Sequence, residues 1–145
     1  MEYAAIAELL RRGFDAYVPL VDDQGIDLVI RSAAPGPTRY ADVQLKARSE
    51  SAKQAGTFSA MSVPNPRANY FYIFWSAAAQ TFWVMPTKDL VKEATRNKTG
   101  DNAGRYSLVF VNQTKAGAKP RPRFARYQGE AGFALLENVV KPFQE

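Results

Sequence analysis

Four polar residues on two neighbouring segments have the types and the spacing that chemistry needs. Asp27 opens an apolar run, and Asp42, Gln44 and Lys46 alternate with apolar residues along a later run. Side chains two residues apart on a β-strand lie on the same face, so Asp42, Gln44 and Lys46 would share one face. Two acids, an amide and a lysine would therefore converge at one place.

These residues are positioned by a predicted β-hairpin. Residues 27–30 have the composition of a first strand, residues 35–37 (Pro-Gly-Pro) favour a turn, and residues 40–46 alternate as the returning strand. The apolar residues of the returning strand indicate that its other face is buried. A polar stripe opposite them is costly unless it is paired or binds something. The plainer alternative is a surface strand on which Asp42 and Lys46 form an ion pair.

The hairpin resembles the core of the PD-(D/E)XK nucleases, the restriction-endonuclease-like superfamily, in which an Asp and an (Asp/Glu)-x-Lys hold a divalent metal. The matching residues are Asp27 and Gln44-Leu45-Lys46, with Gln44 where the usual carboxylate stands. The resemblance implies a metal held by Asp27, the side-chain oxygen of Gln44 and the backbone carbonyl of Leu45. It also implies that Asp27, Gln44 and Lys46 are catalytic, with Lys46 orienting or helping to deprotonate the attacking water.

Further carboxylates are candidates for the same metal site. Asp42 lies on the same predicted face as Gln44 and could replace the missing carboxylate. The resemblance also implies an inward Glu about eleven residues before a Gly, and Glu2 and Gly13 stand in that relation; the alternative for Glu2 is an interaction with the helix dipole. Turn formation explains Asp22 and Asp23, with a place in the outer sphere of the metal as the alternative.

The chain contains no histidine and no cysteine. Their absence excludes Ser-His-Asp and Cys-His nucleophilic sites, histidine acid-base catalysis and ordinary structural zinc sites. Mg²⁺ or Mn²⁺ bound by oxygen atoms is the cofactor that the remaining residue types can hold. No apolar run is long enough for a membrane span, and the N-terminus is no secretory signal, so no membrane partner is expected. The lack of cysteine is compatible with a reducing cytoplasm, where we expect the protein to be.

The net charge of +5 resides in the second half of the chain. Residues 1–72 hold 8 Lys/Arg and 8 Asp/Glu, whereas residues 73–145 hold 11 and 6. The charge is consistent with a polyanion as partner, which the resemblance implies to be DNA, and a solvated basic face is the alternative. Residues 114–126 contain five basic residues and no acidic one, and we expect an exposed loop there. The residues expected to contact nucleic acid are Arg48, Lys53, Arg67, Lys115, Lys119, Arg121, Arg123 and Arg126.

The order of the predicted elements favours an α/β fold with a central mixed β-sheet flanked by helices, which the resemblance identifies with a restriction-endonuclease-like core. We expect one domain over residues 1–145. The six consecutive apolar residues at 70–75 indicate a strand buried on both faces rather than a surface for base stacking. Helices are predicted at 2–12, 88–96 and 128–140, strands at 14–20, 27–30, 40–46, 70–75, 81–85 and 105–111, and a loop at 60–69.

Three functions remain open. The first is a Mg²⁺-dependent endonuclease acting on DNA, whether resolvase-like, restriction-like or homing-type. The second is a nuclease-fold module, weakened by Gln44, that binds nucleic acid or a protein partner. The third is a regulatory or inhibitor protein, which would show little salt-dependent affinity for DNA. The resemblance also implies a prokaryotic or phage origin, and it allows a homodimer because many nucleases of this fold pair to cut both strands.

Overall fold

The structure is a computed structural model that describes residues 2–21, 25–51 and 53–142, without the side chain of Glu2. The expectations for Asp22, Asp23 and the Glu2 carboxylate therefore lie outside the described residues. Along the chain the elements are α1 (Glu2–Arg11), β1 (Phe14–Tyr17), β2 (Leu28–Ser32), β3 (Ala41–Arg48), β4 (Thr57–Met61), β5 (Tyr70–Ser76), β6 (Thr81–Pro86), α2 (Thr87–Glu93), β7 (Thr95–Arg96), β8 (Tyr106–Val109), β9 (Val111–Thr114), β10 (Gly117–Pro120), the 3₁₀ helix η1 (Pro122–Tyr127) and α3 (Gly129–Val140).

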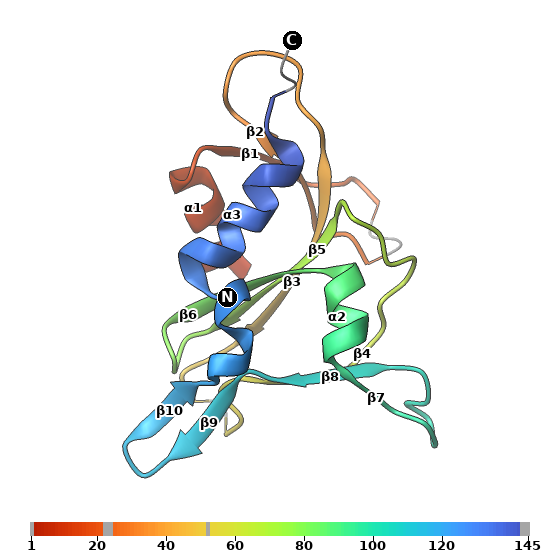
Figure 1. Cartoon of the computed structure of the whole chain (residues 1–145), viewed down its shortest axis with the longest axis vertical. Coiled ribbons are helices and arrows are strands. Elements are labelled where there is room, and N and C mark those ends of the chain that lie inside the picture. The colour runs from red at the N-terminus through yellow and green to blue at the C-terminus, as the bar shows by residue number, and fades with distance from the viewer. Residues whose placement is uncertain (1, 22–24, 52, 143–145) are drawn as a thin grey trace.

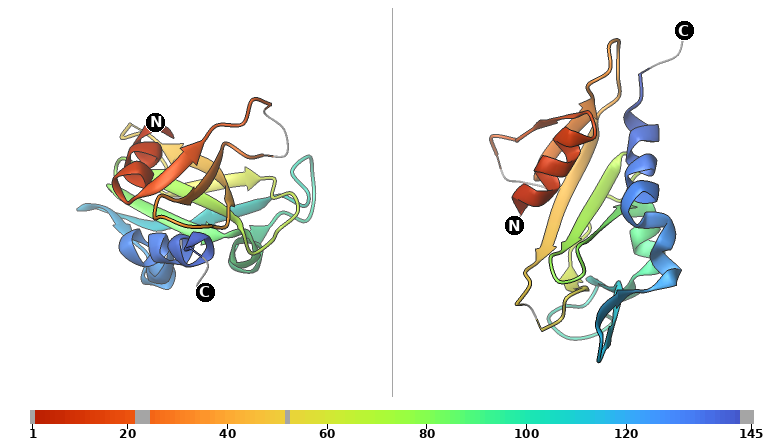
Figure 2. Two further views of the ribbon diagram at one scale, coloured as in Figure 1. Left: turned by 90° about the horizontal axis from the view of Figure 1, so that it is seen from above. Right: turned by 90° about the vertical axis from the view of Figure 1, so that its left-hand side faces the viewer.

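A five-stranded mixed sheet in the order β1-β2-β3-β5-β6 forms the centre of the molecule. Strands β3 and β5 run parallel, and the other neighbouring pairs are antiparallel. Helices α1 and α3 cover one face of this sheet (Figure 1, Figure 2). The predicted α/β architecture with a central mixed sheet flanked by helices is confirmed.

Strand β3 shows the predicted alternation. Val43 and Leu45 are buried at 0% and 4% exposure in the core beneath α1 and α3. The antiparallel pairing of β2 with β3 confirms the hairpin. Residues two apart share a face, so Asp42, Gln44 and Lys46 lie on the opposite side of the sheet.

The opposite side of the sheet is covered by a second, three-stranded sheet in the order β4-β8-β7, together with α2 and η1. Strand β5 supplies side chains to both cores: Phe71 and Ile73 face the helices, while Tyr72 and Phe74 face the second sheet. The prediction that residues 70–75 form a buried strand is confirmed.

Several boundaries in the second half of the chain were predicted wrongly. The expected loop 60–69 begins inside β4, the expected helix 88–96 ends at Glu93 and continues as β7, and the expected strand 105–111 is divided into β8 and β9. The division falls at Phe110, which is fully buried and whose N–H donates to the Gly56 carbonyl at 2.8 Å. The chain thus passes from the three-stranded sheet to the β9–β10 hairpin at Phe110, whose side chain is buried in the core.

The basic segment 114–126 is also more ordered than predicted. It forms β10, paired with β9, and then η1, and the β9–β10 hairpin projects at one end of the molecule (Figure 1). Phe124 and Tyr127 of η1 are buried in the core beneath the second sheet. These two aromatic residues anchor the segment, which sequence composition alone had indicated to be a loop.

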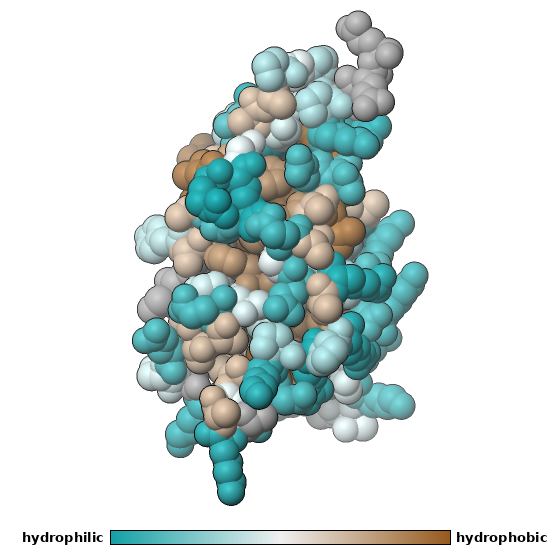
Figure 3. All heavy atoms as spheres, turned by 60° about the vertical axis from the view of Figure 1, so that its left-hand side comes forward, coloured by the Kyte–Doolittle hydropathy of each residue, from teal (hydrophilic) through white to brown (hydrophobic). Residues whose placement is uncertain are grey.

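Hydrophilic side chains cover most of the face shown in Figure 3, with smaller hydrophobic areas between them. Scattered apolar residues on a surface are ordinary for a folded chain. Among the described residues, no helix is both long and apolar enough to cross a membrane.

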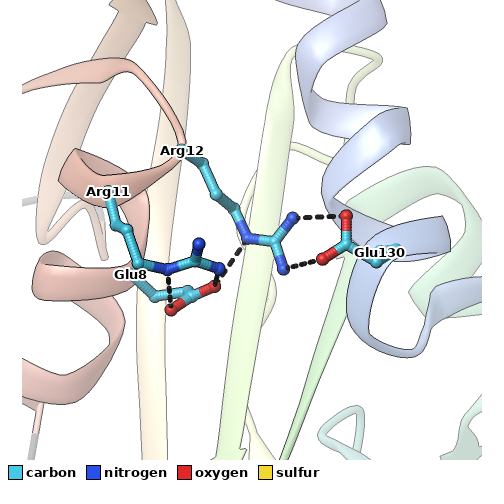
Figure 4. A network of polar contacts seen from close by, with 4 residues as sticks. All are labelled: Glu8, Arg11, Arg12 and Glu130. Carbon is cyan, nitrogen blue, oxygen red and sulfur yellow. Dashed lines mark hydrogen bonds and ion pairs between the residues drawn. The ribbon is translucent and has the colours of Figure 1, made fainter.

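A network of charged residues joins α1 to α3 (Figure 4). Arg12 donates to Glu8 at 2.8 Å and to both carboxylate oxygens of Glu130 at 2.9 and 2.7 Å. Its guanidinium also lies 4.1 Å from the ring centroid of Phe133. The hydrogen bond from Arg12 lowers the pKa of Glu130, and the hydrogen bond from Arg11 is the main cause that lowers the pKa of Glu8.

We predict a pH-dependent stabilisation by this network. Because the pKa of Glu130 in the folded chain lies below its ordinary value of 4.5, the stabilisation is complete above that pH and disappears as the pH falls through the folded-state pKa. Glu130→Gln should therefore lower the free energy of unfolding at pH 7 more than at pH 3, measured by urea unfolding. Glu137→Gln, an exposed change on the same helix, is the control. An equal effect of Glu130→Gln at both pH values would contradict the prediction.

Gly132 allows α3 to pack closely against the rest of the chain. A Cβ at this position would overlap the carbonyl oxygen of Tyr127 and lie 3.1 Å from the Cβ of Val84. Gly132→Ala should lower the free energy of unfolding by about 1–3 kcal/mol, although alanine favours helix, because the added methyl group overpacks the core. Thermal and urea unfolding would measure this loss. The exposed change Asn138→Ala should not destabilise, and a stabilising Gly132→Ala would refute the close approach.

Candidate active site

Asp27 is fixed at the point where the ladder between β2 and β3 ends. Its backbone N–H donates to the Val43 carbonyl at 2.8 Å, and its Oδ2 accepts the backbone N–H of Leu45 at 2.7 Å. The last residue pair of the ladder is Leu28 with Val43. Beyond this pair, the Asp27 carboxylate takes the place of a β2 main-chain carbonyl and accepts the hydrogen bond from β3.

The backbone of Leu45 faces this carboxylate. In a β-strand, the N–H and C=O groups of one residue point to the same edge. Because the Leu45 N–H donates to Asp27, the Leu45 carbonyl also points to the edge of β3 that β2 has left. A carboxylate and a main-chain carbonyl are thus presented at one end of the hairpin.

Gln44 carries a buried acceptor with no donor. Its Oε1 has no hydrogen-bond partner in the part of the chain that the structure describes. A Cβ on Gly25 would lie 3.3 Å from this oxygen and 3.2 Å from Tyr70 Oη, which donates to the Gly25 carbonyl at 2.7 Å. A buried acceptor without a partner costs about 1–3 kcal/mol. A cation or a donor from a ligand would remove that cost.

Two buried tyrosines lie behind the polar face of β3. Burial is the main cause that raises the pKa of Tyr70 and of Tyr72, and the negative charge of Asp27 raises both further. Tyr72 Oη donates to the Ser62 carbonyl at 2.6 Å. Both phenols therefore remain neutral donors at physiological pH and hold the loops on either side of the site.

A pocket of about 600 Å³ opens between β3, β4 and the start of β8. It is lined by both Gln44 and Lys46, and no acidic side chain is among the described residues that line it. The lining residues are Gly25, Gln44, Lys46, Ala47, Arg48, Phe58, Ser59, Ala60, Met61, Ser62, Pro64, Tyr72 and Arg105. Asp27 is not among them; with Leu45 it borders a smaller hollow of about 310 Å³. The predicted site residues thus border two separate hollows: Asp27 and Leu45 line the smaller one, and Gln44 and Lys46 line the pocket on the other face of β3.

Asp42 is paired with a different residue from the one expected. It forms an ion pair with Arg67, whose guanidinium lies 4.7 Å from the ring centroid of Tyr70. The alternative in which Asp42 pairs with Lys46 on a surface strand is therefore wrong. Asp42 could serve a metal only if the pair with Arg67 were broken. No group of three or more acidic side chains that could hold a metal occurs among the described residues.

Three of the predicted nucleic-acid-binding arginines have acidic partners. Arg123 donates to Glu93 at 3.0 Å, and Arg126 approaches Glu93 at 3.5 Å and Asp89 at 3.8 Å. These contacts reduce the positive charge that the two arginines present to a polyanion. The charge of Arg67 is offset in the same way by Asp42.

The remaining predicted contacts are distributed over separate places. Arg121 donates to Asn112 Oδ1 at 2.9 Å, and Lys53, Lys115 and Lys119 are exposed. Arg48 alone of the predicted set lines the pocket with Lys46.

Sequence reasoning missed the part of the pocket that β4 builds. Residues 57–61 were not predicted as a strand, and Arg105 was not singled out. Ala60 has a left-handed φ of 53°, and the pairing of β4 with β8 shifts register between Phe58 and Met61. This is a β-bulge. It arises from pairing with a strand distant in the sequence, so the local sequence pattern does not predict it.

The fold is shared with an enzyme of known structure. A solved structure, that of the bacterial homing endonuclease I-Ssp6803I, is similar to this chain with 21% sequence identity and a TM-score of 0.61. The likeness covers 95% of this chain and 87% of the endonuclease chain. No protein-family model matches the chain, and no curated protein matches it either. The mixed α/β fold of this chain is thus a nuclease-like fold, and function must be argued from the site.

We predict that Gly25 is needed beside Gln44. Gly25→Ala should cost about 1–2 kcal/mol for its left-handed backbone (φ 70°) and about 0.5–1.5 kcal/mol more because the methyl group disturbs Tyr70 Oη. Gly100→Ala is the matched control, since its φ of 79° is similar and its Cβ would meet no atom within 4 Å. Urea unfolding of both variants would measure the difference. Equal losses would mean that the surroundings of Gln44 tolerate the added group.

Proposed function

We propose that this protein is a metal-dependent endonuclease of the PD-(D/E)XK type that hydrolyses DNA phosphodiester bonds. The observation that carries the proposal is the buried, unpartnered Oε1 of Gln44, in the same pocket as Lys46. An acceptor left without a donor beside a lysine suits a site that is completed by a cation and an anionic substrate.

The three protein oxygens proposed to hold the metal come from consecutive strand positions and from Asp27. They are the Asp27 carboxylate, Gln44 Oε1 and the Leu45 carbonyl, a hard donor set that suits Mg²⁺ or Mn²⁺. When bound, such a cation neutralises charge on the phosphoryl group and makes a water molecule easier to deprotonate. Asp27 supplies the only full negative charge of this set.

The chain's own residues then act on the substrate. Lys46 is proposed to orient the attacking water and to stabilise the negative charge that develops on the phosphoryl oxygens. The Leu45 N–H bond keeps the Asp27 carboxylate in place. The neutral hydroxyls of Tyr70 and Tyr72 fix the Gly25 and Ser62 carbonyls on either side of the site.

DNA is the proposed substrate because the described residues that line the pocket include three cations, Lys46, Arg48 and Arg105, and no acid. The name of the structurally similar enzyme, a homing endonuclease, points to the same substrate class. Pairing of two copies would allow both DNA strands to be cut.

A reducing cytoplasm, such as that of a prokaryote, is the proposed location, and the absence of cysteine is compatible with it.

A second candidate function is a nuclease-fold module that binds nucleic acid without cutting it. The observation in its favour is the ion pair between Asp42 and Arg67, which engages the carboxylate that could replace the one missing at Gln44. In that case the pocket would hold a phosphate while metal affinity was too weak for catalysis.

Cleavage of supercoiled and branched DNA with Mg²⁺ or Mn²⁺ tests the proposal. Asp27→Asn keeps an oxygen that can accept the Leu45 N–H but lacks the charge, and Lys46→Ala removes the cation. Each change, and EDTA, should lower the cleavage rate by at least about 100-fold, since a positioned group contributes 10²–10⁴-fold. The surface changes Asp101→Asn and Lys98→Ala are the matched controls.

Gln44→Glu sharpens the same test. The added carboxylate should lower the Mg²⁺ concentration needed for half-maximal cleavage, because it supplies the charge that the site lacks. A wild-type chain that binds DNA and cuts nothing in either metal would replace the enzyme with the binding module. Cleavage that survives Asp27→Asn would remove Asp27 from the site.

A further inference from the structure

The pocket has a second group of cations, at the end away from Gly25 and Gln44. Arg48 is the last residue of β3, and Arg105 directly precedes β8. Arg48 Nε donates to the Thr57 carbonyl at 2.9 Å, and Arg105 Nη1 lies 3.4 Å from the Ala60 carbonyl. Two arginines far apart in the sequence are thus held against the same strand, β4.

The bulge of β4 positions the main-chain carbonyl that Arg105 contacts. Ala60 adopts a left-handed φ of 53°, and its N–H donates to Ser107 Oγ at 3.0 Å. The bulged residues Ser59 and Ala60 line the pocket together with Ser62. Bulges bend a strand and re-aim its groups, and here the Ala60 carbonyl is turned toward Arg105.

These arginines differ from the others in their electrostatic surroundings. Arg67, Arg123 and Arg126 have carboxylate partners, whereas none of the described residues that line the pocket with Arg48 and Arg105 is acidic. Their hydrogen bonds to main-chain carbonyls orient the guanidinium groups and leave the charge unneutralised. An anion is the ligand that such a site favours.

The spacing along β3 separates this site from Lys46. Lys46 and Arg48 lie on the same face two residues apart, a separation of about 7 Å. At this separation, neighbouring phosphates of one backbone can each meet one of the two cations. Guanidinium groups suit phosphate oxygens because they donate two parallel hydrogen bonds.

We propose that Arg48 and Arg105, which donate to the Thr57 and Ala60 carbonyls of β4, form a subsite for a DNA backbone phosphate next to the phosphate that is cut. This subsite rests on the proposed function, in which Lys46 marks the reacting phosphate. It positions the substrate and takes no part in bond cleavage.

The test is the salt dependence of DNA binding, which needs no catalysis. Binding of a short fluorescent duplex of arbitrary sequence would be measured by anisotropy in EDTA between about 50 and 200 mM salt. Arg105→Ala should make the slope of log K against log[salt] less steep by about 0.9, the value for one lost phosphate contact. Arg105→Lys should restore the slope, since it keeps the charge. Lys98→Ala, in the loop before β8 and outside the pocket, should leave the slope unchanged.

The outcomes separate this inference from the proposed enzyme. If Arg105→Ala and Lys98→Ala shift the slope equally while the wild type cuts DNA, the subsite is refuted and the nuclease stands. If the wild type cuts nothing but Arg105→Ala shifts the slope as expected, the nuclease falls and with it the place of the subsite next to a cut phosphate, while the contact of Arg105 with a DNA phosphate stands. Binding of the wild type without salt dependence would overturn both. Unfolding curves for each variant confirm that the chain is folded in every comparison.

Discussion

Burial of β5 on both faces is the constraint on which the rest of this structure depends. Alternate side chains of a strand point to opposite faces, so Phe71 enters the core beneath α1 and α3 while Phe74 enters the core beneath the second sheet. A strand of this composition needs a covering layer on each side. The helices supply one layer, and β4, β8, α2 and η1 supply the other. Strand β3, parallel to β5, lies where the second layer ends, so Gln44 and Lys46 open into a pocket instead of a core.

Opposite charges are kept apart within the candidate site. The Asp27 carboxylate lies at the open edge of β3, bonded to the Leu45 N–H, while the cations of the pocket lie beyond Gln44. Asp42 is paired with Arg67. The described lining of the pocket therefore carries the positive charges of Lys46, Arg48 and Arg105, while the Asp27 carboxylate borders a separate, mostly apolar hollow.

Strand β4 both helps to cover the central sheet and contacts two arginines of the pocket. Its Thr57 and Ala60 carbonyls accept hydrogen bonds from Arg48 and Arg105. In η1, by contrast, Arg123 and Arg126 form ion pairs with acidic residues of α2. Net charge in the second half of the chain is therefore a poorer guide to a binding surface than the absence of nearby carboxylates.

Local patterns were enough to find the strands that carry the site, because alternation in β3 and the continuous apolar run of β5 are themselves the burial pattern. The same patterns placed Asp27, Gln44 and Lys46 at one end of a hairpin. They could not find β4 or β7, since these short strands exist only through pairing with β8. They could not find the partner of Asp42, which lies 25 residues away, or the approach of Arg105 to Ala60, 45 residues away. Contacts of this kind form only when separate layers pack together, so the identities of neighbouring residues in the sequence do not predict them.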